Sequence, residues 1–385
     1  MDFRLTEEQE MIRQMAADFA ANEVAPYAGE WDKNHIVPYD TIKKMQELGL
    51  MTIGVPAEYG GDGLDWLSKY LVCEEIAYGD AGLATTMIAS TLLASDPIWV
   101  GANDEQKKWW YGRMLEGATC GFCLTEPGAG SDALGLSTKC VKDGTDYIIN
   151  GTKQFITNGG HAKQFTVFAT LDKSLKNKGI CCLMVDRDTP GITIGPEEDK
   201  MGIRSSSTTQ VIFEDVRVPG WMMLGGEGAG TPILMETLDL SRTAIAAMAT
   251  GIAHAALNAA LNYANERQQF GKPISSFQAI SFMLADMATA VETARLLYQK
   301  AAWLQDNDLP FKIVSNMAKM YAADTAMKVS TDAVQIFGGY GFVKEYPVEK
   351  YMRDAKIMQI FEGTVQVQRM VIGKYLSQNG YHPYA

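Results

Sequence analysis

The residue best suited to acid–base chemistry is Glu362, in the segment QIFEGTVQVQR at residues 359–369. Ile360 and Phe361 precede the glutamate and Gly363 follows it. A glutamate on a helix usually faces water, and that reading stays open from the residues alone. Apolar neighbours would instead remove the carboxylate from water, which raises its pKa and makes it a better base. Gly363 would let another molecule approach the backbone closely.

Two glycine-rich loops could bind a ligand through backbone N–H groups. TEPGAGSDA at 125–133 follows a predicted strand, and Ser131 adds a hydroxyl that could contact a phosphate. FGGYG at 337–341 ends a predicted helix, where a glycine pair is first a C-cap. Neither loop matches the P-loop, and no G-x-G-x-x-G segment follows a strand and opens a helix. ATP and a Rossmann dinucleotide are therefore both disfavoured.

Three arginines are each open to two interpretations. Arg267, in ERQQFGKP, stands at a predicted helix end, where it could be solvated or could pair with a pyrophosphate. Arg242, in LDLSR, and Arg369, in QVQR, are equally ambiguous when taken singly.

The composition limits the class of protein. The chain has 385 residues, which predicts two or three domains. Its 34 basic and 46 acidic residues give a net charge of −12, so neither duplex nucleic acid nor a membrane surface is expected as a partner. No metal is expected, because the four histidines lack metal-ligand spacing and Cys120 and Cys123 form a lone C-x-x-C. That cysteine pair fits core packing better than a redox role.

No targeting or membrane-spanning segment is expected. No run of 18 or more apolar residues occurs. The polar, acidic start MDFRLTEEQE resembles neither a signal peptide nor a transit peptide. These features predict a cytoplasmic protein.

The pattern of residues predicts helices, then strands, then helices. The first 120 residues have helical spacing, with Thr6 and Gln9 forming a capping box. Short β-rich runs follow from about 121 to 220, joined at Asp143-Gly144 by a hairpin signal and not by helices. Three long helices are then predicted at 241–270, 278–305 and 312–337, with a fourth segment around 345–376.

The expected fold is therefore α+β and multidomain. It comprises an N-terminal all-α domain at 1–120, a middle antiparallel β-barrel or sandwich domain at 121–228, and a C-terminal four-helix bundle domain at 229–385.

Seven motifs taken together resemble those of the acyl-CoA dehydrogenases. They are TEPGAGSDA, NGTKQFITNGG, ERQQFGKPI, FQAISFMLADMA, DAVQIFGGYGF, EYPVEKYMRDAKIMQIFEGT and VQVQR. The resemblance runs from LTEEQ to about residue 376 and is closest to the short- and medium-chain, butyryl-CoA-like members. It implies a three-domain subunit that binds FAD, a homotetramer, and an electron-transferring flavoprotein as electron acceptor.

The resemblance also implies a mechanism. In the family, a glutamate takes the pro-R α-proton of the acyl-CoA thioester while the β-hydrogen leaves as hydride to flavin N5. Glu362 matches that catalytic base, and its N–H would bind the thioester carbonyl together with a flavin ribityl hydroxyl. The product would be the trans-2-enoyl-CoA, or the same site would run the reverse reduction.

The matching positions imply three groups of binding residues. Those that would lie along the flavin are Leu124, Thr125, Ser131, Phe155, Ile156 and Thr157. Those that would reach the adenine dinucleotide half, from a neighbouring subunit, are Arg267, Gln269, Phe270, Gln278, Gln335, Gly339, Thr364 and Gln366. The substrate-side residues would be Ser131, Asp239, Arg242, Gly363 and Arg369.

Two positions bear on the substrate. Some relatives place their base in the LDL-x-R helix, where this chain has Ser241, so Glu362 is favoured. Asp96, in LLASDPIWV, falls on a segment that lines the acyl pocket in the family. Asp96 could be the N-cap of a helix that begins at Pro97. Alternatively, relatives that act on cyclohexenecarboxyl-CoA place an aspartate base in this region.

Two alternatives to a short- or medium-chain acyl-CoA dehydrogenase therefore remain. One is a dehydrogenase of a cyclic thioester such as cyclohexanecarboxyl-CoA, with Asp96 on the substrate side. The other is a non-catalytic flavin- or acyl-CoA-binding protein, against which the presence of Glu362 argues.

Overall fold

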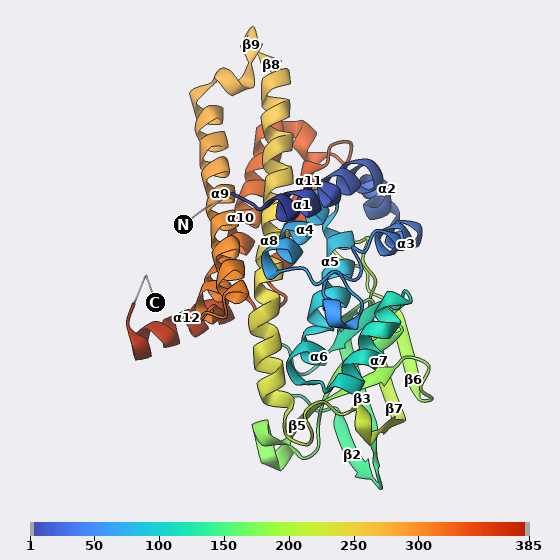
Figure 1. Ribbon diagram of the computed structural model, residues 1–385. Helices are drawn as coiled ribbons and strands as arrows, with labels where there is room; N and C mark the ends of the chain where they lie inside the picture. Colours follow the sequence, from blue (N-terminus) through green and yellow to red (C-terminus); the bar gives the residue numbers. More distant parts are fainter. Residues whose placement is uncertain (1–3, 382–385) are drawn as a thin grey trace.

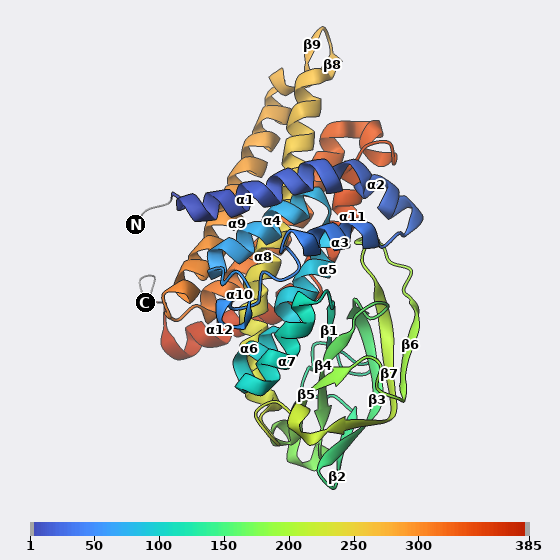
Figure 2. The same ribbon diagram turned by 45° about the vertical axis from the view of Figure 1, so that its right-hand side comes forward.

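The chain folds into two helical parts with a β-sheet part between them (Figure 1). The computed structural model describes residues 4–381. Figures 1 and 2 show the sheet beside one end of the long helix α8 and the small β8–β9 hairpin at its other end. Helix α8 therefore runs from the sheet at one end of the molecule to the β8–β9 hairpin at the other.

The N-terminal part is helical, as its spacing predicts. The capping box is present, since Thr6 and Gln9 exchange hydrogen bonds at 3.0 and 3.2 Å at the start of the first helix. The elements are α1 (Glu7–Phe19), η1 (Ala20–Val24), α2 (Ala25–Asn34), α3 (Tyr39–Glu47), η2 (Ala57–Tyr59), α4 (Trp66–Gly79), α5 (Ala81–Ile88), η3 (Ala89–Leu93), α6 (Asp96–Gly101) and α7 (Asp104–Leu115).

The middle part is a seven-stranded sheet in the order β1-β4-β2-β3-β7-β6, with β5 paired to β4. Four of its strand pairs are antiparallel, as expected, but β4 runs parallel to both β1 and β2. The elements are β1 (Cys120–Cys123), β2 (Lys139–Asp143), β3 (Asp146–Thr157), β4 (Gln164–Thr170), η4 (Lys173–Gly179), β5 (Ile180–Asp186), β6 (Ile192–Glu197), β7 (Thr208–Pro219) and η5 (Gly220–Met222).

The C-terminal part is the predicted bundle with two differences in its limits. Helix α8 begins at Gly230 and not at 241, because Pro232 is tolerated in a first helical turn. The fourth segment is broken at Glu362 into two helices. The elements are α8 (Gly230–Glu266), β8 (Gln268–Gln269), β9 (Lys272–Pro273), η6 (Ile274–Ser276), α9 (Gln278–Asp306), α10 (Lys312–Phe337), η7 (Gly338–Phe342), α11 (Val348–Met358) and α12 (Val365–Asn379).

Two hydrophobic cores hold these parts together. The first is shared by the N-terminal helices and the bundle, with Tyr70 of α4 and Met248 of α8 in one cluster. The second joins the sheet to α6, α7 and the start of α8, and contains Trp110, Phe165 and Ile233. The first 120 residues contribute side chains to both cores, so the cores do not divide the chain at 120/121. The domain limits at 120/121 and 228/229 stay a prediction.

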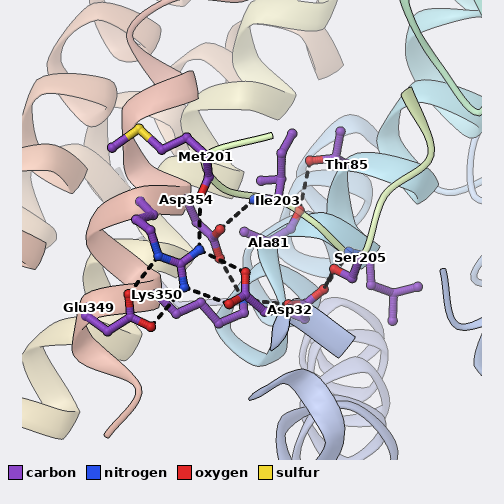
Figure 3. Close-up of polar contacts among 12 residues, drawn as sticks. Asp32, Ala81, Thr85, Met201, Ile203, Ser205, Glu349, Lys350 and Asp354 are labelled. Atoms are coloured by element: carbon purple, nitrogen blue, oxygen red, sulfur yellow. Dashed lines mark hydrogen bonds and ion pairs between the residues drawn. The ribbon is translucent and has the colours of Figure 1, made fainter. Parts of the chain in front are cut away.

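A buried polar junction connects all three parts (Figure 3). The Lys350 amine on α11 donates to Asp80 at 2.7 Å and to Asp354 at 2.6 Å. Asp354 also accepts from the Ile203 N–H at 2.6 Å, and Asp80 accepts from the Ser205 hydroxyl. Asp80 precedes α5 and Ile203 precedes β7, so the junction fixes α11 against both other parts of the chain.

Arg353 extends this junction one turn along α11. Its guanidinium pairs with Asp32 of α2 at 2.6 Å and with Glu349 at 2.7 Å, and donates to the Met201 carbonyl at 2.9 Å (Figure 3). Because α11 leads directly to residues 359–364, these contacts also position the segment that carries Glu362.

Two helical stretches are apolar and long enough to cross a membrane by length and composition alone. They are Ala81–Gly101 and Gly230–Glu266. Within the molecule, 83% and 72% of their most apolar windows are buried. Buried core helices of globular proteins pass the same test, so this is weak support for a membrane span.

The cysteines pack in the cores. All six are free and buried, and burial raises the pKa of the Cys120 thiol to about 12. Such thiols are inert, as the core interpretation predicts. Within residues 4–381, no group of three or more His, Cys, Asp or Glu side chains has the arrangement of a metal site.

Candidate active site

Glu362 lies in the short connection between α11 and α12, with a left-handed backbone at φ 54°. Its carboxylate accepts a hydrogen bond from the Ser241 hydroxyl of α8 at 3.0 Å. Burial raises the pKa of the Glu362 carboxyl, and Ser241, Lys319 and Arg242 partly offset this rise. The residue therefore combines a desolvated carboxylate with three groups that hold or stabilise its ionised form.

The backbone at Glu362 is strained and braced. Gly363 also has a positive φ, 83°, and a Cβ there would come within 2.7 Å of the Gln368 amide nitrogen. The Gln368 side chain of α12 donates to the Glu362 and Gly363 carbonyls, each at 3.2 Å. Lys319 of α10 donates to the Phe361 and Gly363 carbonyls at 2.8 and 2.6 Å. Glycine suits position 363 because its positive φ would strain any other residue, and a Cβ there would displace the Gln368 amide from the two carbonyls.

The Glu362 N–H is available to a ligand. Within the described part of the chain, it donates to no acceptor, whereas its own carbonyl is bonded to Gln368. A free N–H beside a candidate base is the arrangement that can stabilise negative charge forming on a carbonyl oxygen.

Arg242 of α8 is a second cation that acts on Glu362, besides Lys319. It is 7% exposed, pairs with Asp239 at 2.7 Å one helical turn earlier, and leaves its Nε without a partner among the described residues. Both residues lie on α8 beside Ser241 and Glu362, so the structure brings these two predicted substrate residues to the base. Arg369 lies on α12 but is half exposed and pairs with Asp324 at 2.5 Å.

Asp96 is buried at the start of α6. Its N-cap is Ser95, and the Asp96 Oδ2 atom has no partner within residues 4–381, so the capping interpretation of Asp96 is wrong. It borders a cavity of about 10 Å³ that Lys69, Trp66 and Trp99 also line. Burial raises the pKa of Asp96 well above its usual value, and the charge of Glu362 adds to the rise.

The residues predicted to lie along the flavin come from the segment after β1 and from the end of β3. The Gln154 N–H donates to the Thr125 carbonyl at 2.8 Å, which joins the loop after β1 to the end of β3. Phe155 has a left-handed backbone, φ 56°, and is 61% exposed, an unusual placement for a large aromatic ring. The other members are Leu124 and Ile156, both buried, Thr157, half-buried, and Ser131, exposed.

A buried ion pair holds this loop. The Lys153 amine donates to Glu126 at 2.8 Å and to the Leu124 carbonyl at 3.0 Å, and Glu126 in turn accepts from the Ser137 and Thr138 N–H groups. Both charged side chains are almost fully buried. The loop is therefore fixed from inside the sheet, which leaves its outer face for a ligand.

A second cavity lies at the far end of the bundle. It has a volume of about 630 Å³ and is lined by Arg267, Gln269, Tyr340, Gly338 and Gly339, among others. A Cβ at either glycine would meet no atom within 4 Å, so the backbone is open there. Of the other residues predicted with this group, Phe270, Gln278, Gln335 and Gln366 are exposed, and Thr364 caps α12.

The cavity and Glu362 are far apart within one chain. Ser241 contacts Glu362, whereas Arg267 follows the last residue of α8. At 1.5 Å per residue, the 25 residues from Ser241 to Glu266 separate the two places by roughly 38 Å. Arg267 and Gln269 therefore lie too far from Glu362 of their own chain to contact a molecule bound beside that carboxylate.

Sequence reasoning missed three residues of this site. The sequence marks Ser241 only as the position where some relatives carry their base, and it assigns no role to Lys319 or Gln368. Lys319 carries a signal in its spacing, because it shares a helical face with Ser315, Ala322 and Ala326, all fully buried. A lysine on the buried face of a helix requires a partner, and here the partner is the backbone on both sides of Glu362.

Comparison with known proteins gives one consistent result. Three family models match in chain order: "Acyl-CoA dehydrogenase, N-terminal domain" at 6–118, "middle domain" at 121–216 and "C-terminal domain" at 228–377. The short-chain specific acyl-CoA dehydrogenase of Clostridium acetobutylicum is 46% identical over 97% of this chain and 98% of its own length.

Solved structures agree with the sequence relatives. Butyryl-CoA dehydrogenase from Megasphaera elsdenii has a TM-score of 0.95 at 46% identity, covering 98% of this chain and all of that one. A chain solved in work on the electron transferring flavoprotein of Acidaminococcus fermentans has a TM-score of 0.96 at 49% identity, covering 98% and 100%. With the whole fold and nearly the whole sequence matched, the chain belongs to the acyl-CoA dehydrogenase family.

Proposed function

We propose that the protein is an FAD-dependent dehydrogenase of short-chain acyl-CoA thioesters, which it converts to trans-2-enoyl-CoA or forms by the reverse reduction. The observation that carries the proposal is the Glu362 carboxylate, desolvated, hydrogen-bonded to Ser241 and placed beside a free backbone N–H. The short-chain and butyryl-CoA relatives support the choice of acyl group.

Glu362 acts as the base in its ionised form. It takes the α-proton onto a carboxylate oxygen, and the electron pair of the broken α C–H bond forms the α,β double bond as the β-hydrogen leaves with its own pair. Desolvation strengthens the base, since burial raises the pKa of the Glu362 carboxyl. The Ser241 hydroxyl keeps the carboxylate in one orientation.

The developing negative charge on the thioester oxygen needs a donor. The Glu362 N–H is the donor that this chain offers, and the brace of Lys319 and Gln368 fixes its direction. A preorganised donor lowers the barrier because it needs no reorganisation when the charge forms.

The residues present fit FAD, the cofactor of acyl-CoA dehydrogenases. The exposed Phe155 ring presents an apolar face for a flat ring system, and the backbone around Gly339 is open beside the Arg267 guanidinium. When bound, FAD supplies the acceptor for the hydride that leaves the β-carbon. Leu124, Thr125, Ile156 and Thr157 would hold the flavin end, with Ser131 reaching both cofactor and substrate.

The adenine end would lie on a second copy of the chain. Arg267 and Gln269 line the far cavity, roughly 38 Å along α8 from Ser241, so they cannot serve the flavin beside their own Glu362. Phe270, Gln278, Gln335 and Gly339 belong to the same proposed group. Thr364 and Gln366, which follow Glu362 at the start of α12, would complete the cofactor site from the side of the base. A homotetramer built by the bundles would complete each site from a neighbour.

The proposed partners follow from the same family. An electron-transferring flavoprotein would reoxidise the cofactor, which the Acidaminococcus fermentans relative supports. A cytoplasmic location stays a prediction from the N-terminal sequence.

A cyclic acyl group is the second candidate substrate, and Asp96 favours it. The Asp96 carboxyl is buried, has an unpaired oxygen and interacts electrostatically with Glu362, so a polar group borders the region expected to take the acyl chain. An aspartate in this region serves as the base in relatives that act on cyclohexenecarboxyl-CoA, and this resemblance is what favours a cyclic substrate. Asp96→Asn would change relative rates for cyclohexanecarboxyl-CoA and butyryl-CoA if Asp96 contacts the acyl group, and would change neither if it does not.

Anaerobic bleaching of the bound flavin tests the proposal. Purified protein is mixed with butyryl-CoA, octanoyl-CoA and cyclohexanecarboxyl-CoA in turn, and the loss of flavin absorbance is followed. Rapid bleaching by butyryl-CoA supports a short-chain dehydrogenase, whereas fastest bleaching by the cyclic thioester supports the alternative. Tight binding without bleaching by any of the three would favour a non-catalytic flavin- or acyl-CoA-binding protein.

A further inference from the structure

The Lys319 side chain holds the backbone on both sides of the candidate base. Its amine donates to the Phe361 carbonyl at 2.8 Å and to the Gly363 carbonyl at 2.6 Å, and the side chain is fully buried. These contacts join α10 to the connection between α11 and α12, across 42 and 44 residues of sequence. No other lysine in residues 4–381 bonds to the 361–363 backbone.

The segment that Lys319 holds has an unfavourable conformation. Glu362 and Gly363 have φ values of 54° and 83°, and a left-handed backbone at a residue with a Cβ costs of order 1–3 kcal/mol. Such a conformation persists only where the surrounding contacts determine it. Lys319 supplies two of those contacts and Gln368 supplies two longer ones, each at 3.2 Å.

The same contacts set the direction of the Glu362 N–H. The Phe361 carbonyl and the Glu362 N–H belong to one planar trans peptide and point in opposite directions. An amine that fixes the carbonyl on the interior side therefore aims the N–H away from the interior. A charged donor on the carbonyl also polarises the amide, which strengthens the hydrogen bond its N–H can donate.

The charged groups around this segment are few. Lys319 and Arg242 both face Glu362 and lower the pKa of its carboxyl, in opposition to the larger effect of burial. Asp96 of α6 interacts with Glu362, and Asp324 of α10 interacts with Lys319. Burial lowers the pKa of Lys319 to about 7, against the attraction of Glu362.

We propose that Lys319 is a positioning residue for the dehydrogenation described above: it fixes the left-handed turn that aims the Glu362 carboxylate and the Glu362 N–H at the same thioester. The role rests on the proposed function. It differs from a role in folding alone, because within residues 4–381 the amine donates only to the Phe361 and Gly363 carbonyls, on either side of the base.

The test compares Lys319→Met with Lys328→Met in the FAD-loaded protein. Methionine keeps the length of the buried side chain and removes both hydrogen bonds. Lys328 lies on the same helix α10 but is exposed and pairs with Asp332. Three quantities are measured for each variant: the rate of flavin bleaching at saturating butyryl-CoA, the dissociation constant of butyryl-CoA, and the pH dependence of the bleaching rate.

A misaimed base lowers the rate and leaves binding nearly intact. For Lys319→Met, we expect the saturating rate to fall by about 10²-fold, the size of effect that a small misplacement produces. The dissociation constant should stay within about threefold, and the midpoint of the acid limb should move to higher pH because a positive neighbour of Glu362 is lost. Lys328→Met should match the parent in all three.

Several outcomes would overturn the role of Lys319. One is a folded, fully FAD-loaded Lys319→Met protein with the parental rate and pH midpoint. If that variant does not fold, Lys319→Gln, which can keep one of the two hydrogen bonds, takes its place with the same expectations. A crystal structure of the parent with the Lys319 amine more than about 4 Å from both carbonyls would overturn the role without any variant. A parent protein that butyryl-CoA does not bleach contradicts the proposed function itself, so the two failures are distinguishable.

Discussion

The Ser241 hydroxyl donates to the Glu362 carboxylate at 3.0 Å, across 121 residues of sequence. Ser241 lies on α8 and Glu362 follows α11, so the contact depends on how the bundle packs. Because a hydrogen bond to a carboxylate favours its ionised form, Ser241 tunes the base as well as orienting it.

Removing that hydroxyl should shift the pH dependence of the reaction. Ser241→Ala deletes a group that lowers the pKa of the Glu362 carboxyl, so this pKa rises further. The reaction needs the carboxylate, and its rate falls as the pH drops through the Glu362 pKa. We expect the acid limb of kcat/KM to move up by about one pH unit, as loss of a charge-assisted hydrogen bond implies.

Ser377→Ala is the matched control for this shift. The Ser377 hydroxyl of α12 donates to the Lys374 carbonyl at 2.8 Å, is exposed, and has no carboxylate partner among the described residues. Identical acid limbs in the Ser241→Ala and parent proteins would contradict the assignment of the base to Glu362.

The junction around Lys350 should contribute strongly to stability. Lys350→Met leaves the buried Asp80 and Asp354 carboxylates without their cation, and breaking such a buried pair costs about 3–5 kcal/mol. We expect a clear fall in the thermal midpoint of the FAD-loaded protein, followed by far-UV circular dichroism.

Lys356→Met controls for the loss of a lysine from α11. Lys356 is exposed and bonds only to Gln359 at 2.9 Å, so its replacement should leave the midpoint within about 1–2 °C of the parent. Equal midpoints for the two variants would show that the junction in Figure 3 does not hold the three parts together.

Two variants that are inactive alone should regain activity in mixed oligomers if each cofactor site is formed by two subunits. Arg267→Ala removes the guanidinium of the far cavity, and Glu362→Gln removes the base, roughly 38 Å away along α8. In an oligomer made of either variant alone, butyryl-CoA should bleach the bound flavin slowly. In mixed oligomers, a subunit with Glu362 can sit beside a neighbour with Arg267, and activity should return in part.

The complementation is measured by co-expressing the two variants with different affinity tags and purifying through both. Butyryl-CoA should then bleach a fraction of the bound flavin at the parental rate. Mixed oligomers that are as slow as either parent variant would contradict a site shared between subunits.

The hairpin turn and the end of α10 could be predicted, because the residues within each of these short segments determine its backbone conformation. Asp143-Gly144 predicts the hairpin, and β2 and β3 pair from Asp143 to Asp146 around it. Gly338 ends α10 with φ 61°, as the C-cap interpretation requires. The apolar flanks also indicated correctly that Glu362 is partly removed from water, since it is half-buried and desolvation raises its pKa.

The partners of Glu362 could not be predicted in the same way. Ser241, Lys319 and Gln368 come from three different helices, and their contacts depend on how those helices pack. Sequence spacing shows that Lys319 lies on a buried face, but it does not show which backbone the amine meets. The break of the fourth segment at Glu362 was missed for the same reason, because the side chains that stabilise its left-handed turn lie elsewhere.

The rate of flavin bleaching by Glu362→Gln tests the central claim most directly. Glutamine keeps the shape and the backbone N–H but cannot accept the α-proton, and Glu214→Gln, at an exposed position on β7, serves as the control. We predict that Glu362→Gln retains FAD and binds butyryl-CoA but bleaches at least about 10²-fold more slowly than the parent. A Glu362→Gln protein that bleaches as fast as the Glu214→Gln control would contradict the account.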